Sequence, residues 1–354
     1  MSAIAPAIRV ALDAMGGDHA PSETVLGAIQ AAREYGIGVY LVGREEAIRA
    51  ELAKHDITGL DLPIVHTDEV IEMDEHPATA VRRKKNASMT LALQLVCDGS
   101  ALGAVSAGNS GAMVAAASLS TIKRIPSVDR AALGGIFPTR DSACMVIDIG
   151  ANTDCKPRYL QQFALMGSIY MERIFGVASP RVALLANGEE ETKGDQLVIE
   201  AHQLLKASAA TLGLNFIGNI EGRDIPAGGA DVVVCDGFVG NVVLKLSEGL
   251  AETLLGLIRT QMTSSLPSKL AAAVLRPGLR KVVRRLDYAE YGGVPILGVN
   301  GSAIVAHGRS NAKAIKNALR VARQTAETGV ANAIAEGLTK LATPGEEDKQ
   351  QAGI

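Results

Sequence analysis

The same local pattern recurs six times along this chain of 354 residues: a short apolar run, a glycine, a few polar residues and then a helical pattern. Each copy predicts a buried strand, a tight loop and a helix. One such junction is explained by turn geometry alone, because βα turns use glycine. Six junctions that also carry Asp, Asn, Ser, His or Lys predict a doubly wound α/β/α sandwich with a mostly parallel sheet, whose strand ends line a crevice. The junctions begin at Gly16, Gly108, Gly150, Gly188, Gly237 and Gly308.

Composition agrees with helices on both faces of a sheet. The chain is 47% hydrophobic but only 3% aromatic, so Val, Leu, Ile and Ala must fill the core. We expect a single α/β unit over residues 1–342 and a disordered polar tail over residues 343–354. The stretch Gly99–Ile122 is uncharged and long enough to span a bilayer, but Asn109 and its internal glycines favour a strand, a loop and a buried helix.

Charge and cysteine usage exclude several classes of protein. The net charge of −3 indicates no general attraction for nucleic acid. The four cysteines are scattered without a C-x-x-C pair, which indicates neither a disulfide framework nor a zinc site. The N-terminal segment lacks the charged start and long apolar run of a signal peptide. We therefore expect a cytoplasmic protein with no metal site and no nucleic-acid partner.

Small residues and hydrogen-bond donors follow the predicted strands, which favours an anionic ligand. Glycines let the backbone approach a phosphate-like group closely, and N–H and hydroxyl groups can then donate to it. The P-loop, G-x-G-x-x-G and G-x-S-x-G motifs are missing, which argues against NTPases, NAD enzymes and serine hydrolases. Cys235 ends a Val-rich strand, so packing is a better interpretation than a nucleophile. The predicted ligands of substrate or phosphate are Gly16, Gly17, Asp18, His19, Ser106, Gly108, Asn109, Ser110, Gly111, Asn152, Asp154, Gly188, Glu189, Gly237, Asn241 and His307.

The segment Arg181–Lys206 carries the most highly charged of these loops. An apolar run ends at Ala186, and a helical pattern resumes at Gln196. Lys193 stands just before that helix, whose first N–H groups also favour negative charge, so it is a candidate anion ligand. A solvated lysine in a charged loop is the alternative interpretation.

Seven motifs resemble, in order and spacing, those of the phosphate acyltransferases of bacterial phospholipid synthesis. The resemblance runs from about residue 8 to about residue 330. Ala87 stands where the family commonly has a serine, and Ala186 where it commonly has an asparagine, which casts doubt on a hydroxyl or amide role at these two positions. The motifs are LDAMGGDHAP (12–21), SAGNSGAM (106–113), DIGANTDCKP (148–157), GEEETKG (188–194), NIEGRDI (219–225), CDGFVGNVVLK (235–245) and GVNGSAIVAHG (298–308).

This resemblance implies transfer of an acyl group from acyl-[acyl carrier protein] to inorganic phosphate, giving an acyl phosphate. It implies that a membrane glycerol-3-phosphate acyltransferase then uses the product for phospholipid synthesis. It also implies a homodimer and a fold similar to phosphotransacetylase and to the isocitrate and isopropylmalate dehydrogenases, with two intertwined subdomains. Lys193 and Asp236 match the family's motifs as catalytic residues. No metal or organic cofactor is expected, because thioester and acyl phosphate are both activated carriers.

The expected mechanism is direct attack of phosphate on the thioester. Phosphate is already a dianion near neutral pH, because its last pKa is about 6, so it needs placement more than deprotonation. Backbone donors and Lys193 would balance the charge of the developing oxyanion. Asp236 would orient Lys193 or a donor, or handle the proton of the departing thiol; capping the helix after Gly237 is the structural alternative.

Residues 253–290 are predicted to form a basic amphipathic helical arm. No acidic residue occurs from Thr253 to Leu286, and Pro267 and Pro277 predict short separate helices. Such a segment suits an anionic membrane surface, and hence peripheral membrane association, or an acidic partner such as the carrier protein. A helix pair at a dimer interface is the alternative. The docking residues would be Lys269, Arg276, Arg280, Lys281, Arg284 and Arg285.

Three other functions stay open from the sequence. A phosphotransacetylase-like enzyme that uses coenzyme A thioesters would keep the same crevice. A non-catalytic module that binds acyl carrier protein or anionic lipid would not need Lys193. A dehydrogenase of the related fold is opposed by the missing NAD fingerprint.

Overall fold

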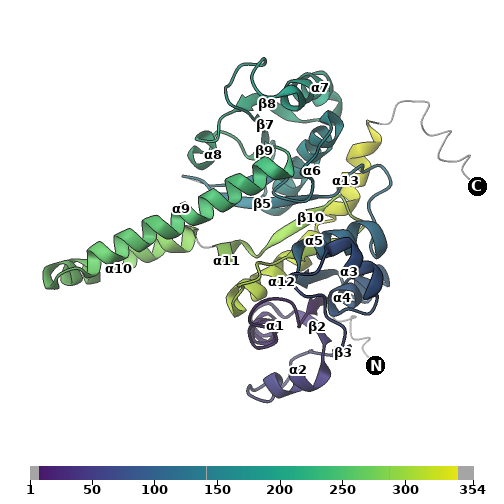
Figure 1. Cartoon of the computed structure of the whole chain (residues 1–354), viewed down its shortest axis with the longest axis vertical. Helices are drawn as coiled ribbons and strands as arrows, with labels where there is room; N and C mark the ends of the chain where they lie inside the picture. The colour runs from purple at the N-terminus through teal and green to yellow at the C-terminus, as the bar shows by residue number, and fades with distance from the viewer. Residues whose placement is uncertain (1–7, 141, 287, 342–354) are drawn as a thin grey trace, which may run out of the picture.

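The sheet of this protein is a single twisted layer with helices on both faces (Figure 1). The computed structural model describes residues 8–140, 142–286 and 288–341, and within them the sheet has eleven strands in the order β3-β2-β1-β4-β11-β10-β5-β6-β9-β7-β8. Neighbouring strands are parallel except in the middle, where β10 is antiparallel to β11 and β5, and β5 is antiparallel to β6. The predicted, mostly parallel α/β/α sandwich is confirmed. The predicted tail over residues 343–354 lies outside the described residues.

The first half of the sheet buries side chains on both faces. Val10 and Leu12 of β1 belong to a core cluster shared with α1 and α12, whereas Ala11 belongs to a cluster on the opposite face. Successive side chains of a strand point to opposite faces, so both faces must be covered by helices. The elements of this half are β1 (Arg9–Asp13), α1 (Ser22–Tyr35), β2 (Gly38–Gly43), α2 (Glu45–Leu52), β3 (Ile64–His66), α3 (Pro77–Arg83), α4 (Ser88–Cys97), β4 (Gly103–Ser106), α5 (Ser110–Ala115), the π-helical turn Ala116–Ser120, β11 (Ser302–Val305) and α12 (Ala312–Glu327).

The second half is built in the same way around its own core. Met145 and Ile147 of β6 pack in one cluster with Phe163 of the following helix. The last described helix, α13, belongs to this half, because it packs on α6, whereas α12 packs on α1 of the first half. The elements are β5 (Ala132–Pro138), β6 (Ala143–Ile147), α6 (Pro157–Phe175), β7 (Arg181–Leu185), α7 (Gln196–Leu212), β8 (Asn215–Ile220), α8 (Asp224–Ala227), β9 (Val232–Val234), β10 (Val294–Leu297) and α13 (Val330–Thr339).

A long helical hairpin projects from the body between these halves (Figure 1). It consists of α9 (Gly237–Thr263) and α10 (Leu266–Leu286), and the short helix α11 (Tyr288–Tyr291) follows it. The predicted division at Pro277 is wrong, because α10 continues through this residue. Pro267 lies in the first turn, where its missing N–H has no intrahelical partner. Along its length α10 packs against α9. We call this hairpin the arm.

None of the helices in the described ranges combines the length and the apolar character needed to cross a bilayer. The uncharged stretch Gly99–Ile122 instead contains β4, a glycine-rich loop, α5 and the π-helical turn that ends at Ser120. The predicted strand, loop and buried helix are confirmed for this stretch.

Candidate active site

The loops after β1 and β4 meet over a buried carboxylate. Asp13 ends β1, and it accepts hydrogen bonds from Ser106 Oγ at 2.7 Å and from the Met15 N–H at 3.1 Å. Burial raises the pKa of Asp13, and these hydrogen bonds oppose the rise. Ser106 was predicted to bind phosphate, but its hydroxyl is used to join two strands.

Gly16 allows this close contact between loops. A Cβ atom on Gly16 would lie 2.6 Å from Asp13 Oδ2 and 2.7 Å from the Gly108 nitrogen, which is too close for any side chain. The loop after β11 joins the other two, because the Asp18 N–H donates to the Gly308 carbonyl at 2.8 Å. Three of the six predicted junctions are therefore in contact.

The amide of Asn109 is engaged within the protein. Its Oδ1 accepts a hydrogen bond from the Ala112 N–H at 3.0 Å and caps α5. Its Nδ2 donates to the carbonyls of Met73 at 3.2 Å and Glu75 at 3.0 Å. Both amide hydrogens are thus used to hold the loop against the segment before α3, which leaves the side chain no donor for a phosphate.

A second buried carboxylate shapes the loop after β6. Asp148 is fully buried, and its oxygens accept hydrogen bonds at 2.7–3.1 Å from the backbone N–H groups of Leu133, Gly150, Ala151 and Asn152 and from the side-chain amide of Asn152. Burial raises the pKa of Asp148, and hydrogen bonds from the N–H groups of Ala151, Leu133 and Gly150 and from the Asn152 side chain oppose the rise. The loop is held in one conformation against β5.

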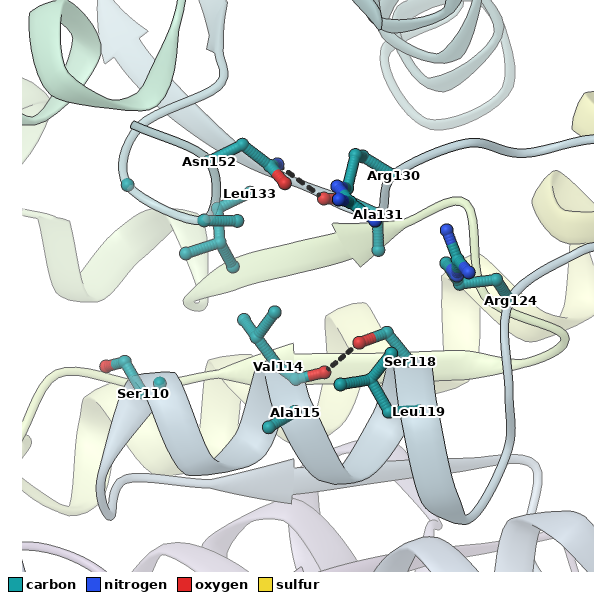
Figure 2. A pocket seen from close by; sticks show the side chains of 13 residues that line it. Ser110, Val114, Ala115, Ser118, Leu119, Arg124, Arg130, Ala131, Leu133 and Asn152 are labelled. Atoms are coloured by element: carbon teal, nitrogen blue, oxygen red, sulfur yellow. Dashed lines mark hydrogen bonds between the residues drawn. The ribbon is translucent and has the colours of Figure 1, made fainter. Parts of the chain in front are cut away.

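The loop after β9 packs on the loop after β6. The Gly237 N–H donates to the Asn152 carbonyl at 2.7 Å, and Asn152 Nδ2 donates to the Ala131 carbonyl at 2.8 Å (Figure 2). Asn241 lies one turn into α9 and faces Gly150, at which a Cβ atom would be 3.8 Å from Asn241 Oδ1. Two further predicted junctions are therefore in contact in the second half.

Two pockets lie between the halves and share Ser110, Leu133 and Gly150, which we call the cleft centre. The first pocket has a volume of about 400 Å³. Figure 2 shows it between α5 and the loops that carry Arg130 and Asn152, with Ser110 at one end and Arg124 and Arg130 at the other. The second pocket has a volume of about 260 Å³ and lies against α9, β10 and β11. The two pockets together form one cleft.

The second pocket is largely apolar with a few polar groups. Lys245 Nζ lies 3.2 Å from Glu248 Oε2 in its wall, and His307 lies nearby. Burial lowers the pKa of His307; Glu248 opposes this shift, and Lys245 adds to it. His307 is therefore uncharged at neutral pH. The apolar lining residues are Leu133, Ile136, Ile149, Leu244, Val294 and Val305.

The cysteines near the cleft are poor nucleophiles. Burial raises the pKa of Cys155 to about 12, and it also raises the pKa of Cys235. Both thiols are protonated at neutral pH, so the packing interpretation of Cys235 agrees with its buried position. Across the described residues, no group of three or more His, Cys, Asp or Glu side chains is arranged to hold a metal ion.

Comparison with known proteins decides the family. A family model described as "Fatty acid synthesis protein" matches residues 8–333. The phosphate acyltransferase of Pelotomaculum thermopropionicum is 50% identical over 338 residues, which are 96% of this chain and 97% of that protein. The phosphate acyltransferase of Heliobacterium modesticaldum is 52% identical over 338 residues, 95% and 99% of the two chains. This chain belongs to the phosphate acyltransferase family.

Membership of the phosphate acyltransferase family makes the chain an acyltransferase and confirms the resemblance seen in the sequence. A solved phosphotransacetylase from Streptococcus pyogenes matches the fold with a TM-score of 0.61 and 20% identity, covering 91% of this chain and 94% of that one. At this identity the likeness shows the fold alone, and it agrees with the phosphotransacetylase-like sandwich that the sequence predicts.

The two residues predicted to be catalytic in this phosphate acyltransferase follow adjacent strands. Lys193 follows β7 and Asp236 follows β9, and these strands pair with each other. Asp236 caps α9, because its Oδ1 accepts hydrogen bonds from the N–H groups of Phe238 at 2.8 Å and Val239 at 3.0 Å. Lys193 is exposed, and its stem lies over Gly188. Neither side chain lines the two cleft pockets.

The other predicted ligands fall into two groups. Five line the cleft pockets: Ser110, Gly111, Asn152, Asn241 and His307. The rest lie in the surrounding loops, outside the pocket walls: Gly16, Gly17, Asp18, His19, Ser106, Gly108, Asn109, Asp154, Gly188, Glu189 and Gly237.

Three cationic residues of the cleft were not predicted. Arg124 and Arg130 line the first pocket, and Lys245 lines the second. Lys245 stands four residues after Asn241 in one helix, and this spacing puts both on the same face, so the sequence held a signal for it. Arg130 precedes β5, a strand that the sequence pattern did not predict.

The arm carries both exposed apolar residues and a basic groove. Leu246 and Leu250 of α9 are exposed, as are Leu270 and Val274 of α10. The groove is lined by residues of α10 together with Met262 of α9, and it has a volume of about 520 Å³. Of the predicted docking residues, those that line it are Lys269, Arg276, Arg280 and Arg284. Lys281 and Arg285 also belong to α10.

Proposed function

We propose that this phosphate acyltransferase moves a fatty acyl group from acyl-[acyl carrier protein] to inorganic phosphate. A phosphate oxygen attacks the thioester carbon, so that a C–O bond forms and the C–S bond breaks. The thiolate leaves and takes up a proton to become the carrier-protein thiol. The family supports acyl transfer to phosphate, and the carrier protein as donor is our inference from the sequence motifs.

The observation that carries the proposal is the cleft centre, where a polar pocket meets an apolar one. A thioester carbonyl beside Ser110 would have donors and cations of the first pocket on one side. On the other side the apolar walls of the second pocket, including Leu133 and Leu244, would receive the start of the alkyl chain. A thioester carbonyl at the cleft centre would therefore have polar groups on one side and apolar walls for the alkyl chain on the other.

Negative charge must be balanced as phosphate attacks and the oxyanion forms. We propose that the Ser110 hydroxyl donates to the oxyanion and that a lysine balances the charge of the phosphate. Lys193 is the lysine indicated by the family motif, and Lys245 is the one that lines the cleft. Asp236 would act by fixing the loop that it caps at the N-terminus of α9.

No metal or organic cofactor is needed in this proposal. The thioester already supplies the activated acyl group, and the phosphate dianion is already nucleophilic near neutral pH. The role of the protein is to place the two reactants together and to stabilise charge, which can account for a large part of a rate enhancement.

We propose that the arm binds a second copy of this chain to form a homodimer. Exposed leucines recur at intervals of three or four residues along α9, at positions 246, 250, 254 and 257. Such a stripe is typical of helices that pack against other helices. Two copies of the hairpin could cover each other's stripes.

The basic groove of the arm suits an acidic partner. We propose that Arg276, Arg280 and Arg284 dock the acidic carrier protein and that the same arm allows peripheral contact with an anionic membrane. The enzyme would then be cytoplasmic and would release acyl phosphate close to the membrane glycerol-3-phosphate acyltransferase that consumes it.

The test is phosphate-dependent release of the carrier-protein thiol from long-chain acyl carrier protein. We expect the wild type to form acyl phosphate, and we expect Lys193→Ala to lower kcat/KM by about a hundredfold. Lys245→Ala is compared in the same assay. Lys206→Ala is the matched control, because Lys206 of α7 is exposed and pairs with Glu191.

Each result has a defined meaning. Full activity of Lys193→Ala together with loss in Lys245→Ala would assign the charge-balancing role to Lys245. Turnover of acyl coenzyme A without turnover of acyl carrier protein would favour the phosphotransacetylase-like alternative. No turnover of either thioester would contradict the proposed reaction and leave the binding-module alternative.

A further inference from the structure

The first cleft pocket has charge at one end only. Arg124 and Arg130 lie at the end opposite Ser110, as Figure 2 shows. Between the two ends the wall carries no charge: Val114 of α5 and Leu119 of the π-helical turn are apolar, and Ser118 and Asn152 add uncharged polar groups. Leu119 stands nine positions after Ser110, which corresponds to at most about 13 Å along the helix axis. A free phosphate ion is too small to reach both ends.

Arg130 has no acidic partner in the described part of the chain. Its guanidinium stacks over the Tyr159 ring with 5.6 Å between the guanidinium carbon and the ring centroid. The neighbouring acid, Asp129, is engaged elsewhere, because its Oδ2 lies 3.0 Å from Arg158 Nε and 3.0 Å from Gln162 Nε2. Arg130 is therefore a cation in a pocket wall, and the acid next to it in the sequence pairs with another residue.

The loop that presents Arg130 is held in place before any ligand binds. Arg124 donates to the carbonyl of Asp129, and Gln162 accepts from the Asp129 N–H at 2.9 Å and donates to the Ser127 carbonyl at 3.1 Å. Asn300 Nδ2 donates to the Arg124 carbonyl at 3.0 Å. A preorganised cation binds an anion at a lower entropic cost than a mobile one does.

A ligand that matches this pocket is elongated, with an anionic group at one end, an uncharged middle and a reacting group at the other end. The phosphopantetheine arm has this form, because a phosphate and a thioester flank a chain of alkyl and amide groups. We propose that Arg130, with Arg124 beside it, binds the phosphate of that arm and so sets the thioester at the cleft centre. This inference rests on the proposed function, since it identifies how the acyl donor is recognised.

Arg130 is then a specificity-determining residue for the donor and not for inorganic phosphate. The interaction is a charge-assisted hydrogen bond, for which loss of one partner costs about ten- to a hundredfold in binding. We therefore expect Arg130→Gln to raise the KM for the acyl donor by that factor while kcat and the KM for inorganic phosphate change little.

The experiment removes first the phosphate of the donor and then the guanidinium of Arg130. Turnover is measured with acyl-phosphopantetheine and with acyl-pantetheine, which lacks the phosphate, for the wild type, Arg130→Gln and Arg130→Lys. Arg158→Gln is the matched control, because Arg158 lies on the adjacent helix, pairs with Asp129 and does not line the pocket. The wild type should prefer the phosphorylated donor, Arg130→Gln should lose that preference, Arg130→Lys should keep part of it, and the control should keep all of it.

Three results would overturn the inference. The first is that Arg130→Gln lowers the activity equally with the phosphorylated and the unphosphorylated donor. The second is that this variant raises only the KM for inorganic phosphate. The third is that it lowers the activity with acyl carrier protein but not with acyl-phosphopantetheine. The last result would place Arg130 against the surface of the carrier protein.

A binding measurement separates this inference from the proposed function. Phosphopantetheine and pantetheine are titrated calorimetrically into the full-length wild type and Arg130→Gln. Tighter binding of phosphopantetheine that disappears in the variant supports the subsite even if no thioester is turned over. Equal binding of phosphopantetheine by both proteins contradicts the subsite even if the acyltransferase activity is confirmed.

Discussion

The body of the molecule and its arm use apolar residues in opposite ways. In the body, Leu12, Phe163 and Ile304 are completely buried. In the arm, Leu246 is 68% exposed and Val274 is 81% exposed. Full burial of such a side chain stabilises a protein by about 1.5–3 kcal/mol, so the body holds its own stabilisation, whereas the arm needs a partner to obtain it. The apolar residues of the body therefore stabilise its own fold, whereas those of the arm are available to a partner.

Polar groups show the reverse difference. In the body, Asp13 and Asp148 are buried at strand ends, and neighbouring donors satisfy their oxygens. In the arm, the cationic side chains of Arg276, Arg280 and Arg284 line an open groove. Buried polar groups fix the loops of the cleft, and exposed ones are available to a partner.

The largest effect is expected at Asp148, which tests the claim that buried polar groups stabilise the body. Asp148→Ala would leave five N–H donors without their acceptor and should lower the free energy of unfolding by at least about 3 kcal/mol. Urea denaturation monitored by circular dichroism measures this. The control Asp154→Ala changes an exposed residue of the same loop and should stay within about 0.5 kcal/mol. A loss below 1 kcal/mol at Asp148 would contradict the role assigned to it.

The next effect is expected in the arm, where association should change and folding should not. Leu250→Glu puts a charge in the exposed leucine stripe and should raise the Kd of the dimer by at least about thirtyfold. The free energy of unfolding of the body should change by less than about 0.5 kcal/mol. Sedimentation velocity over a range of concentrations measures the first quantity, and urea denaturation of the monomer measures the second.

Arg259→Glu is the matched control for the arm. It adds a carboxylate nine residues further along the same helix, which is half a turn away from the stripe. Equal weakening of the dimer by both variants would show that added charge alone is responsible. An unchanged dimer in Leu250→Glu would mean that the stripe is not the interface.

The smallest effect is expected at the joint between the body and the arm. His307 faces Lys245 and Glu248 of α9, with Arg309 and Asp18 nearby, and burial lowers its pKa below the ordinary value of about 6.5. Below pH 6.5 the unfolded chain binds a proton that the folded chain does not, so stability is full above that pH and falls as the pH drops through the folded pKa. His307→Gln should remove this part of the pH dependence. Urea midpoints between pH 7.5 and pH 5 measure it, and identical slopes for both proteins would refute the assignment.

Much of the fold follows from local pattern. The apolar run and glycine at Gly150 or Gly188 indicated a strand and a loop without knowledge of any contact, and β6 and β7 end there. The strand β5 was missed because Gly134 and Gly135 interrupt its apolar pattern. Their missing side chains make room for neighbours: a Cβ atom on Gly134 would be 2.8 Å from Met145 Cε, and one on Gly135 would be 2.8 Å from Ile149 Cδ1.

Less of the site was predictable, because a side chain's partners come from distant segments. Asn109 looked like a phosphate ligand, yet its amide donates to carbonyls 34–36 residues earlier in the chain. Arg130 was not predicted as a site residue, because β5, the strand that follows it, was not predicted. Its position in a pocket wall opposite Ser110 exists only once α5 and the loop before β5 have packed together.

The sequence by itself determined the alternation of strands and helices, the polar character of the strand ends and the family. These properties depend on periodicity and on short motifs, which are local. Only the tertiary structure decided which polar groups face the cleft and which are hydrogen-bonded within the protein. It also decided that the arm extends as two long helices with exposed leucines. The physical reason is that hydrogen-bond partners and burial are set by contacts between segments far apart in the chain, and no local pattern contains them.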